Sequence, residues 1–172
     1  MRNVKYDFSS CHIELPTSLA EDIINWGRTE VHDDDLYVTQ KDPTFGREDE
    51  MHITILYGIY SDSPDQIKTL IKGFGPIKVE LGSIDIFSNN YKFDVVMIDV
   101  YSQDLIELNK ELESQIKHKS KYPIYTPHVT IAYVKKGKGW KYRGNKKWEG
   151  KQFTCNHVVF SSKNGGKERI AT

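Results

Sequence analysis

The sequence predicts an α+β protein in which helices cover antiparallel or mixed sheets. Three observations support this class. Short β-branched runs alternate with amphipathic stretches of helical period, Gly and Pro mark the boundaries, and no linker or low-complexity segment divides the chain. With 172 residues, of which 38% are apolar and 28% charged, the chain is long enough for a single domain over 1–172 with its own core.

The first half of the chain predicts two strands and two helices. Residues 9–15 (SSCHIEL) alternate between polar and apolar, which is the period of a strand, and Pro16 ends that run. Ser63 and Pro64 are typical of a helix start, and Gly73 is typical of a helix end. The elements expected are a strand at 9–15, a helix at 19–27 capped by Thr17 or Ser18, a long acidic loop at 30–50, a strand at 51–58 and a helix at 63–73.

The second half predicts a hairpin followed by the clearest helix of the chain. Ser102 is a good N-cap, and Leu105, Leu108, Leu112 and Ile116 recur with helical period. The elements expected are strands at 77–87 and 91–101 joined by a turn at 88–90, a helix at 102–120, a strand at 128–134, a basic loop at 135–151, a last strand near 153–162 and a frayed tail at 162–172.

The chain contains a hidden duplication. A strand–helix–strand order at 9–58 is repeated at 92–134, and the two copies share the sequences HITILY and HVTIAY, which are identical at four of six positions. A single His-x-Thr arises easily by chance, but a matched pair in matched strands is specific. Two lobes related by a pseudo-twofold axis would bring these strands side by side. The lobes are expected at about 9–90, with the motif His52-Ile53-Thr54-Ile55, and at about 91–161, with the motif His128-Val129-Thr130-Ile131.

Each motif offers a histidine and a threonine from one face of a strand, because side chains two residues apart point the same way. His52 and Thr54 would then face His128 and Thr130 across a cleft. Imidazoles with pKa values near about 6.5 can exchange protons at neutral pH, one as general base and the other as general acid. The hydroxyls can donate hydrogen bonds to oxygens that gain charge in the transition state. In-line displacement at a phosphodiester, by a 2′-hydroxyl or a water, uses such a set of groups without a metal.

These paired tetrapeptides resemble the two H-x-T-x signatures of the 2H phosphoesterase superfamily, which includes the LigT-like enzymes once named 2′-5′ RNA ligases. Residues 11–27 (CHIELPTSLAEDIINWG) are similar to the family's opening strand, Leu-Pro turn and helix. Residues 46–59 (GREDEMHITILYGI) are similar to the approach to its first motif. The resemblance covers about residues 9–161.

The resemblance implies two α+β lobes with antiparallel sheets around a central cleft. It implies metal-independent cleavage of cyclic phosphates, 2′-5′ linkages or related phosphodiesters. Carried over residue by residue, it gives His52 and His128 as the acid/base pair and Thr54 and Thr130 as phosphate-positioning hydroxyls. Both motifs are intact, which favours an enzyme over a degenerate binding-only member.

The resemblance leaves the substrate open. Members of the family act on tRNA-derived cyclic phosphates, on 2′-5′ oligoadenylates, on small nucleotide or ADP-ribose cyclic phosphates and on cyclic oligonucleotide signals. The last group includes phage proteins that destroy the messengers of bacterial defence, and a chain of this size without an extra domain fits that group. The acidic segment 30–50 departs from the compact loop expected of LigT-like members, which weakens any transfer of their RNA specificity.

A basic loop follows the second motif strand directly. Between residues 135 and 151 the chain carries seven Lys and one Arg against a single Glu, interleaved with aromatic residues. This mixture is typical of contact with single-stranded nucleotides, although a solvated hairpin tip has the same composition. Tyr122 and Tyr125, which lead into the second motif, could stack on a base or pack in the core. The residues expected to bind substrate are Tyr125, Lys138, Trp140, Tyr142 and Arg143.

Composition bounds the partners and the compartment. Basic and acidic residues number 24 each, so net charge points to no partner. Cys11 and Cys155, the only cysteines, give no zinc signature and no disulfide framework. No signal peptide and no apolar run near 18 residues is present. We therefore expect a cytoplasmic monomer of a bacterium or a phage-infected cell, with no membrane contact and no cofactor.

The remaining histidines are interpreted as structural. His12 alternates with Ser10 and Glu14 on the first strand and could face the cleft, but a structural role is favoured; His118 and His157 are left as structural. His32 precedes the acidic residues 33–35, but no strand or helix spacing fixes ligands there, so no metal is expected. Two other readings of the whole chain stay open. One is a non-catalytic module that binds a nucleotide or RNA end in the same cleft, and the other is an RNA-binding protein that uses the basic loop and carries incidental histidines.

Overall fold

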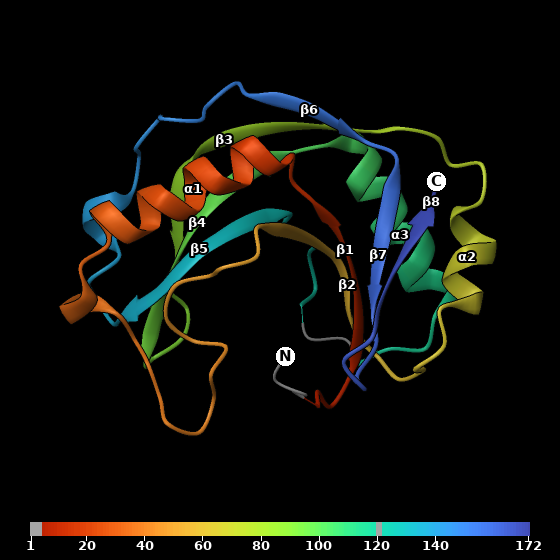
Figure 1. Ribbon diagram of the computed structural model, residues 1–172, viewed down its shortest axis with the longest axis horizontal. Helices are drawn as coiled ribbons and strands as arrows, with labels where there is room; N and C mark the ends of the chain where they lie inside the picture. The colour runs from red at the N-terminus through yellow and green to blue at the C-terminus, as the bar shows by residue number, and fades with distance from the viewer. Residues whose placement is uncertain (1–4, 120–121) are drawn as a thin grey trace.

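The computed structural model describes residues 5–119 and 122–172, which fold into two four-stranded sheets flanked by helices (Figure 1). The α+β class is confirmed, and every strand pair in these ranges is antiparallel. None of the helices described is long and apolar enough to span a membrane. The elements are β1 (Ser9–Glu14), α1 (Thr17–Glu30), β2 (His52–Ile59), α2 (Asp65–Ile71), β3 (Ile77–Phe87), β4 (Phe93–Tyr101), α3 (Gln103–Gln115), β5 (His128–Lys135), β6 (Gln152–Cys155), β7 (His157–Ser161) and β8 (Lys167–Ala171).

The duplication is visible in the two sheets, whose strand orders are β2-β1-β7-β8 and β5-β4-β3-β6. In each sheet the motif strand lies at an edge and pairs with the strand that precedes the helix, β2 with β1 and β5 with β4. The sheets stand opposite each other like the two sides of an arch, and β2 and β5 lie on its inner side in mutual contact (Figure 1). The two motifs are therefore brought together from distant parts of the chain.

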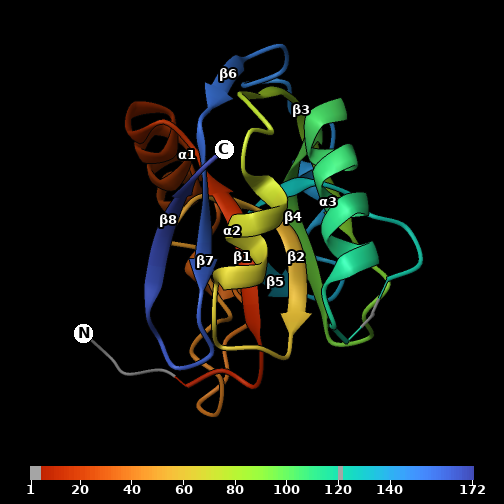
Figure 2. The ribbon, with the colours of Figure 1, turned by 90° about the vertical axis from the view of Figure 1, so that its right-hand side faces the viewer.

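Each half of the molecule uses its helix to cover the motif strand of the other half. Helix α1 packs on β5, where Gly27 allows a close approach: a Cβ there would lie 3.1 Å from Cγ2 of Ile131. Helix α3 packs on β2, and Asn109 Nδ2 donates a hydrogen bond of 2.8 Å to the carbonyl of Ile55. Ile55 and Ile131 are the equivalent last residues of the two motifs. Helices α2 and α3 lie side by side over the sheet that contains β1 and β2 (Figure 2).

The outer edge of each motif strand is also covered by chain from the other half. Segment 36–48 runs along β5 and exchanges hydrogen bonds of 2.9 and 2.8 Å with the backbone of Tyr133. Segment 117–119 runs along β2, where Lys119 N donates to the carbonyl of Gly58 at 2.9 Å. Both motif strands are thus hydrogen-bonded on both sides, which fixes the register of their side chains.

Helix α3 forms as the sequence predicts. The Ser102 hydroxyl accepts a hydrogen bond of 3.1 Å from Leu105 N, which satisfies one of the free N–H groups of the first turn. Leu105, Leu108 and Leu112 are buried on one face, and Ile116 is buried directly after the helix ends. The apolar stripe therefore anchors α3 against the sheets.

Two predictions about the C-terminal part are wrong. Residues 153–162 form two strands, because β6 pairs with β3 in one sheet while β7 pairs with β1 in the other. Residues 162–172 do not form a tail, since β8 pairs with β7 and buries Ile170. The lobe limits shift accordingly. Strand β3 belongs to the sheet of the second motif, and β7 and β8 belong to the sheet of the first.

Candidate active site

Both motif strands present their histidine and threonine on the face opposite to their buried isoleucine and valine positions. Ile53, Ile55, Val129 and Ile131 are at most 1% exposed, whereas the alternating histidines and threonines are partly accessible. The period of the strand explains this pattern, because one face packs under a helix and the other faces the inside of the arch. The four polar residues concerned are His52, Thr54, His128 and Thr130.

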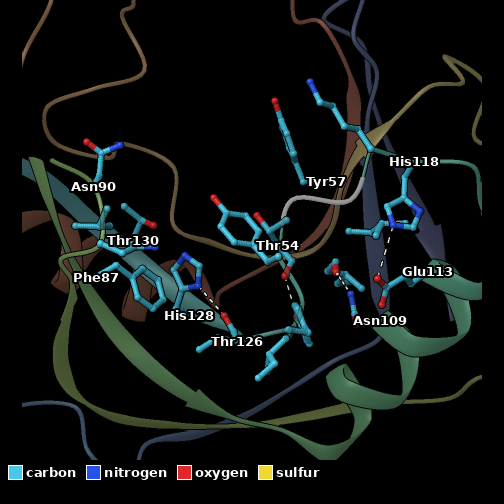
Figure 3. Close-up of a pocket in the computed structure, with 18 of the residues that line it drawn as sticks. Thr54, Tyr57, Phe87, Asn90, Asn109, Glu113, His118, Thr126, His128 and Thr130 are labelled. Atoms are coloured by element: carbon cyan, nitrogen blue, oxygen red, sulfur yellow. Dashed lines mark hydrogen bonds and ion pairs between the residues drawn. The ribbon is translucent and has the colours of Figure 1, made fainter. Parts of the chain in front are cut away.

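The two motif histidines are held by the same backbone contact. Nδ1 of His52 lies 2.7 Å from the carbonyl of Glu50, and Nδ1 of His128 lies 2.8 Å from the carbonyl of Thr126 (Figure 3 shows the second bond). A carbonyl only accepts, so each Nδ1 carries the proton and donates it. Nε2 of each ring is left as the atom that can take or give a proton in the site.

The surroundings of His128 are largely apolar. Phe87 packs edge-on against its ring, with centroids 4.7 Å apart and planes at 89°. Burial lowers the pKa of His128, the hydrogen bond to Thr126 opposes this, and the charge of His52 lowers the pKa further. His128 is therefore biased toward the neutral imidazole, which is the form of a general base.

The surroundings of His52 are polar. His12 lies against its ring, with centroids 5.0 Å apart, and Glu14 lies opposite it on β1. The carboxylates of Glu48 and Glu50 interact electrostatically with His52, and Glu50 also pairs with Lys167. The two matched motifs thus sit in unlike environments.

A cavity of about 610 Å³ opens beside the second motif and reaches across to β2. Thr54, His128 and Thr130 line it, and so does Tyr125, whose hydroxyl donates a hydrogen bond of 2.8 Å to the carbonyl of Thr54. In Figure 3, His128 and Phe87 lie at one end of the cavity and His118 and Glu113 at the other, with Thr54 between them. Tyr125 therefore lies where a substrate contact was expected and also fixes the first motif strand.

The basic segment 135–151 lies elsewhere. Lys138, Trp140, Tyr142 and Arg143 do not line the cavity. Tyr142 is buried against the ring of Trp26 on α1, with centroids 6.0 Å apart. The expectation that these four residues bind substrate therefore finds no support in their placement, and the site proposed below leaves them out.

Acidic side chains from distant elements explain the position of this segment. Arg143 pairs with Asp85 at 2.9 Å, and Lys141 pairs with Asp35. Trp148 is buried, and its Nε1 donates a hydrogen bond of 2.8 Å to Asp22 on α1. The basic and aromatic side chains that suggest nucleotide binding hold the segment to the rest of the fold through these contacts.

The acidic residues after His32 are also engaged in ion pairs. Asp33 pairs with Arg47 at 2.6 Å, and Asp35 pairs with Lys141. Within residues 5–119 and 122–172, no three His, Cys, Asp or Glu side chains are placed to hold a metal ion.

Sequence reasoning missed several residues of the cavity wall, and three of them come from α3 or the segment directly after it. Glu113 and Asn109 come from α3, and His118 follows that helix. Nothing in their local sequence distinguishes them, because a helix with an apolar stripe has polar residues on its other faces as a rule. Only the packing of α3 on β2, the motif strand of the other half, brings them to the site.

Comparison with known proteins places this architecture in a family. A family model described as the 2′-5′ RNA ligase superfamily matches residues 17–167. This chain belongs to that superfamily. The resemblance to 2H phosphoesterases is thereby confirmed, and the two His-x-Thr motifs of this superfamily member lie within the matched range.

Individual relatives of this 2′-5′ RNA ligase superfamily member agree with the assignment. An RNA 2′,3′-cyclic phosphodiesterase of Methanocaldococcus jannaschii is 30% identical over 91 residues, which are 51% of this chain and 53% of that protein. The chain thus aligns with about half the length of this curated relative. E. coli LigT in its apo form superposes with a TM-score of 0.62 at 18% identity, covering 98% of this chain and 95% of that one. Kluyveromyces marxianus Usb1 with uridine monophosphate has a TM-score of 0.54 at 9% identity, covering 96% and 98%. At these identities the two structures show a shared fold.

Proposed function

We propose that this protein is a phosphodiesterase that cleaves a nucleotide phosphodiester or cyclic phosphate by two-histidine acid/base catalysis. One observation carries the proposal. Two equivalent strands each hold a histidine by Nδ1, leaving Nε2 available, and each presents a threonine two residues further along the same face. Membership of the 2′-5′ RNA ligase superfamily supports it, as does the relative named RNA 2′,3′-cyclic phosphodiesterase.

The unlike surroundings of the two histidines support a division of labour. Neutral His128, in its apolar setting, takes the proton from the attacking water or hydroxyl. His52 takes the complementary role and gives its proton to the leaving oxygen. The hydroxyls of Thr54 and Thr130 donate to the non-bridging oxygens as their charge grows. The reaction balances without an external oxidant or metal: one P–O bond forms, one breaks, and the two imidazoles exchange protonation states.

The substrate we propose is a nucleotide or a short or cyclic oligonucleotide. LigT has been solved with 3′-AMP and Usb1 with uridine monophosphate, and both share this fold. The cavity of about 610 Å³ is within the usual range for small-molecule sites, about 300–1,000 Å³. A cyclic oligonucleotide defence signal is one candidate within this class, and turnover by a monomer without a metal is part of the proposal.

The experiment is a substrate panel with products resolved by mass. It contains 2′,3′-cyclic nucleotides, 2′-5′ and 3′-5′ dinucleotides, and cyclic di- and trinucleotides, each incubated with the full chain with and without EDTA. Cleavage of at least one class that persists in EDTA supports the proposal. Binding without any change of ligand would favour the non-catalytic module instead, and cleavage abolished by EDTA would contradict the metal-independent mechanism.

A further inference from the structure

The cavity continues past Thr54 to a second group of polar side chains that the proposed chemistry does not use. His118 Nε2 lies 3.8 Å from Oε1 of Glu113, and both residues line the cavity at the end away from His128 (Figure 3). The side chain of His118 is only 12% exposed, whereas Glu113 keeps 47% of its side chain accessible. A ligand that reaches this end would meet an accessible carboxylate held beside a nearly buried imidazole.

Segment 117–119, which carries His118 at this end of the cavity, is held against β2 by hydrogen bonds and close packing. His118 Nδ1 donates a hydrogen bond of 2.8 Å to the carbonyl of Ile116. Lys119 N donates to the carbonyl of Gly58 at 2.9 Å, and a Cβ at Gly58 would lie 2.7 Å from the Lys119 carbonyl oxygen. Gly58 also has a φ of +80°, a conformation that glycine adopts readily. The position of His118 is therefore set by close packing against β2.

The charge at this end identifies the kind of group that fits. Glu113 is the single carboxylate among the described residues that line the cavity, and Lys119, which follows His118, is the single lysine among them. A carboxylate repels a phosphate but accepts hydrogen bonds from N–H groups. Leu56, Tyr57 and Tyr122 also line the cavity. Aromatic and aliphatic walls with one polar end are typical of a site for a nucleobase, which stacks on its faces and hydrogen-bonds through its edge.

We infer that the Glu113–His118 end of the cavity is a base subsite that selects nucleobases with an exocyclic amino group. This inference rests on the proposed function, because the phosphate must lie at the motif histidines for the base to reach Glu113. The Glu113 carboxylate accepts the amino N–H of adenine, cytosine or guanine. Uracil and hypoxanthine present a carbonyl oxygen or no group at the corresponding place, and their oxygen faces the carboxylate unfavourably.

The test uses matched ligands that differ in one group. Binding of 3′-CMP is compared with 3′-UMP, and of 3′-AMP with 3′-IMP, by titration calorimetry on the full chain at constant salt. We expect the amino-bearing member of each pair to bind about tenfold more tightly, as a hydrogen bond to a partly exposed charged group allows. Equal binding within both pairs, or no binding of any of the four, overturns the inference.

Variants locate the selectivity. Glu113→Gln should reduce the preference to about threefold or less, because the amide offers a weaker acceptor and adds a donor. Glu111→Gln on the same helix is the matched control and should keep the preference, since Glu111 is exposed and does not line the cavity. A preference that survives in Glu113→Gln contradicts the assignment of the subsite. Turnover of 2′,3′-cyclic CMP is measured separately, so a failure of catalysis with the base preference intact counts against the proposed function alone.

Discussion

His12 lies against His52, with ring centroids 5.0 Å apart and ring planes inclined by 56°. Burial lowers the pKa of His12 to about 4, and the charges of His52 and Lys167 contribute in the same direction. His12 therefore stays neutral near pH 7, where it contacts the His52 ring without adding a positive charge beside it.

This arrangement predicts an acid-labile fold. Between about pH 6.5 and pH 4 the His12 ring is protonated in the unfolded chain but not in the native one, so stability falls as the pH is lowered through that window. The shift corresponds to about 3 kcal/mol in the free energy of unfolding. Urea titrations should show that the free energy of unfolding falls less between pH 7 and pH 4.5 in His12→Asn than in the wild type. An identical loss in both proteins would contradict the buried neutral ring.

The pH profile of turnover should report the setting of His128. The general base must be neutral, and burial lowers the pKa of His128, so the acidic limb of kcat/KM should lie below the value of about 6.5 typical of a free histidine. Phe87→Ala removes the apolar ring that packs on His128 and should move this limb toward higher pH. An acidic limb of kcat/KM above pH 6.5 in the wild type would mean that another group is the general base.

Tyr125 should stabilise the first motif strand through one hydrogen bond. Tyr125→Phe removes the hydroxyl that donates to the Thr54 carbonyl, which should cost about 1 kcal/mol of stability and lower the melting temperature by about 2–4 °C. Tyr122→Phe is the control, because Tyr122 lines the same cavity but is 68% exposed. Equal melting temperatures for the two variants would show that the hydrogen bond contributes little.

Substitutions at two glycines with the same backbone conformation distinguish the cost of backbone strain from the cost of a steric clash. Gly58 and Gly73 have φ values of +80° and +77°, but a Cβ meets the Lys119 carbonyl only at Gly58 and nothing within 4 Å at Gly73. Gly73→Ala should lower the free energy of unfolding by about 1–2 kcal/mol through backbone strain alone. Gly58→Ala should lose about 1–3 kcal/mol more in urea unfolding, because segment 117–119 must move away from β2. Equal losses would mean that this segment is loosely held.

The motif strands and α3 could be predicted because their signals are local. A period of two around His52 and His128, and leucines at helical spacing after Ser102, need no knowledge of the rest of the fold. The repeated motif also predicted that two distant strands meet, since duplicated halves pack about a common axis. Strand β8 had no such signal, because it carries one buried apolar residue, Ile170, and is held by pairing with β7.

The rest of the site depends on long-range packing. His118 and Glu113 reach the cavity because α3 lies on the motif strand of the other half, which no local pattern reveals. For the basic segment 135–151 the local sequence suggested a place in the site, and long-range packing puts it elsewhere. Its lysines and arginine suggest a phosphate-binding flap, but Asp22, Asp35 and Asp85 engage members of it from three separate parts of the chain. Composition records the charges of a segment and not the partners that neutralise them.

The central claim is that both motif imidazoles act on one phosphate, and single-turnover cleavage by His52→Asn and His128→Asn tests it most directly. The asparagine amide can replace the Nδ1 donor to the backbone carbonyl, while the Nε2 position is lost. Each variant should cleave the best substrate of the panel about 10²–10⁴-fold more slowly, with the affinity for its product changed by only a few fold. Wild-type rates in either variant would contradict the account.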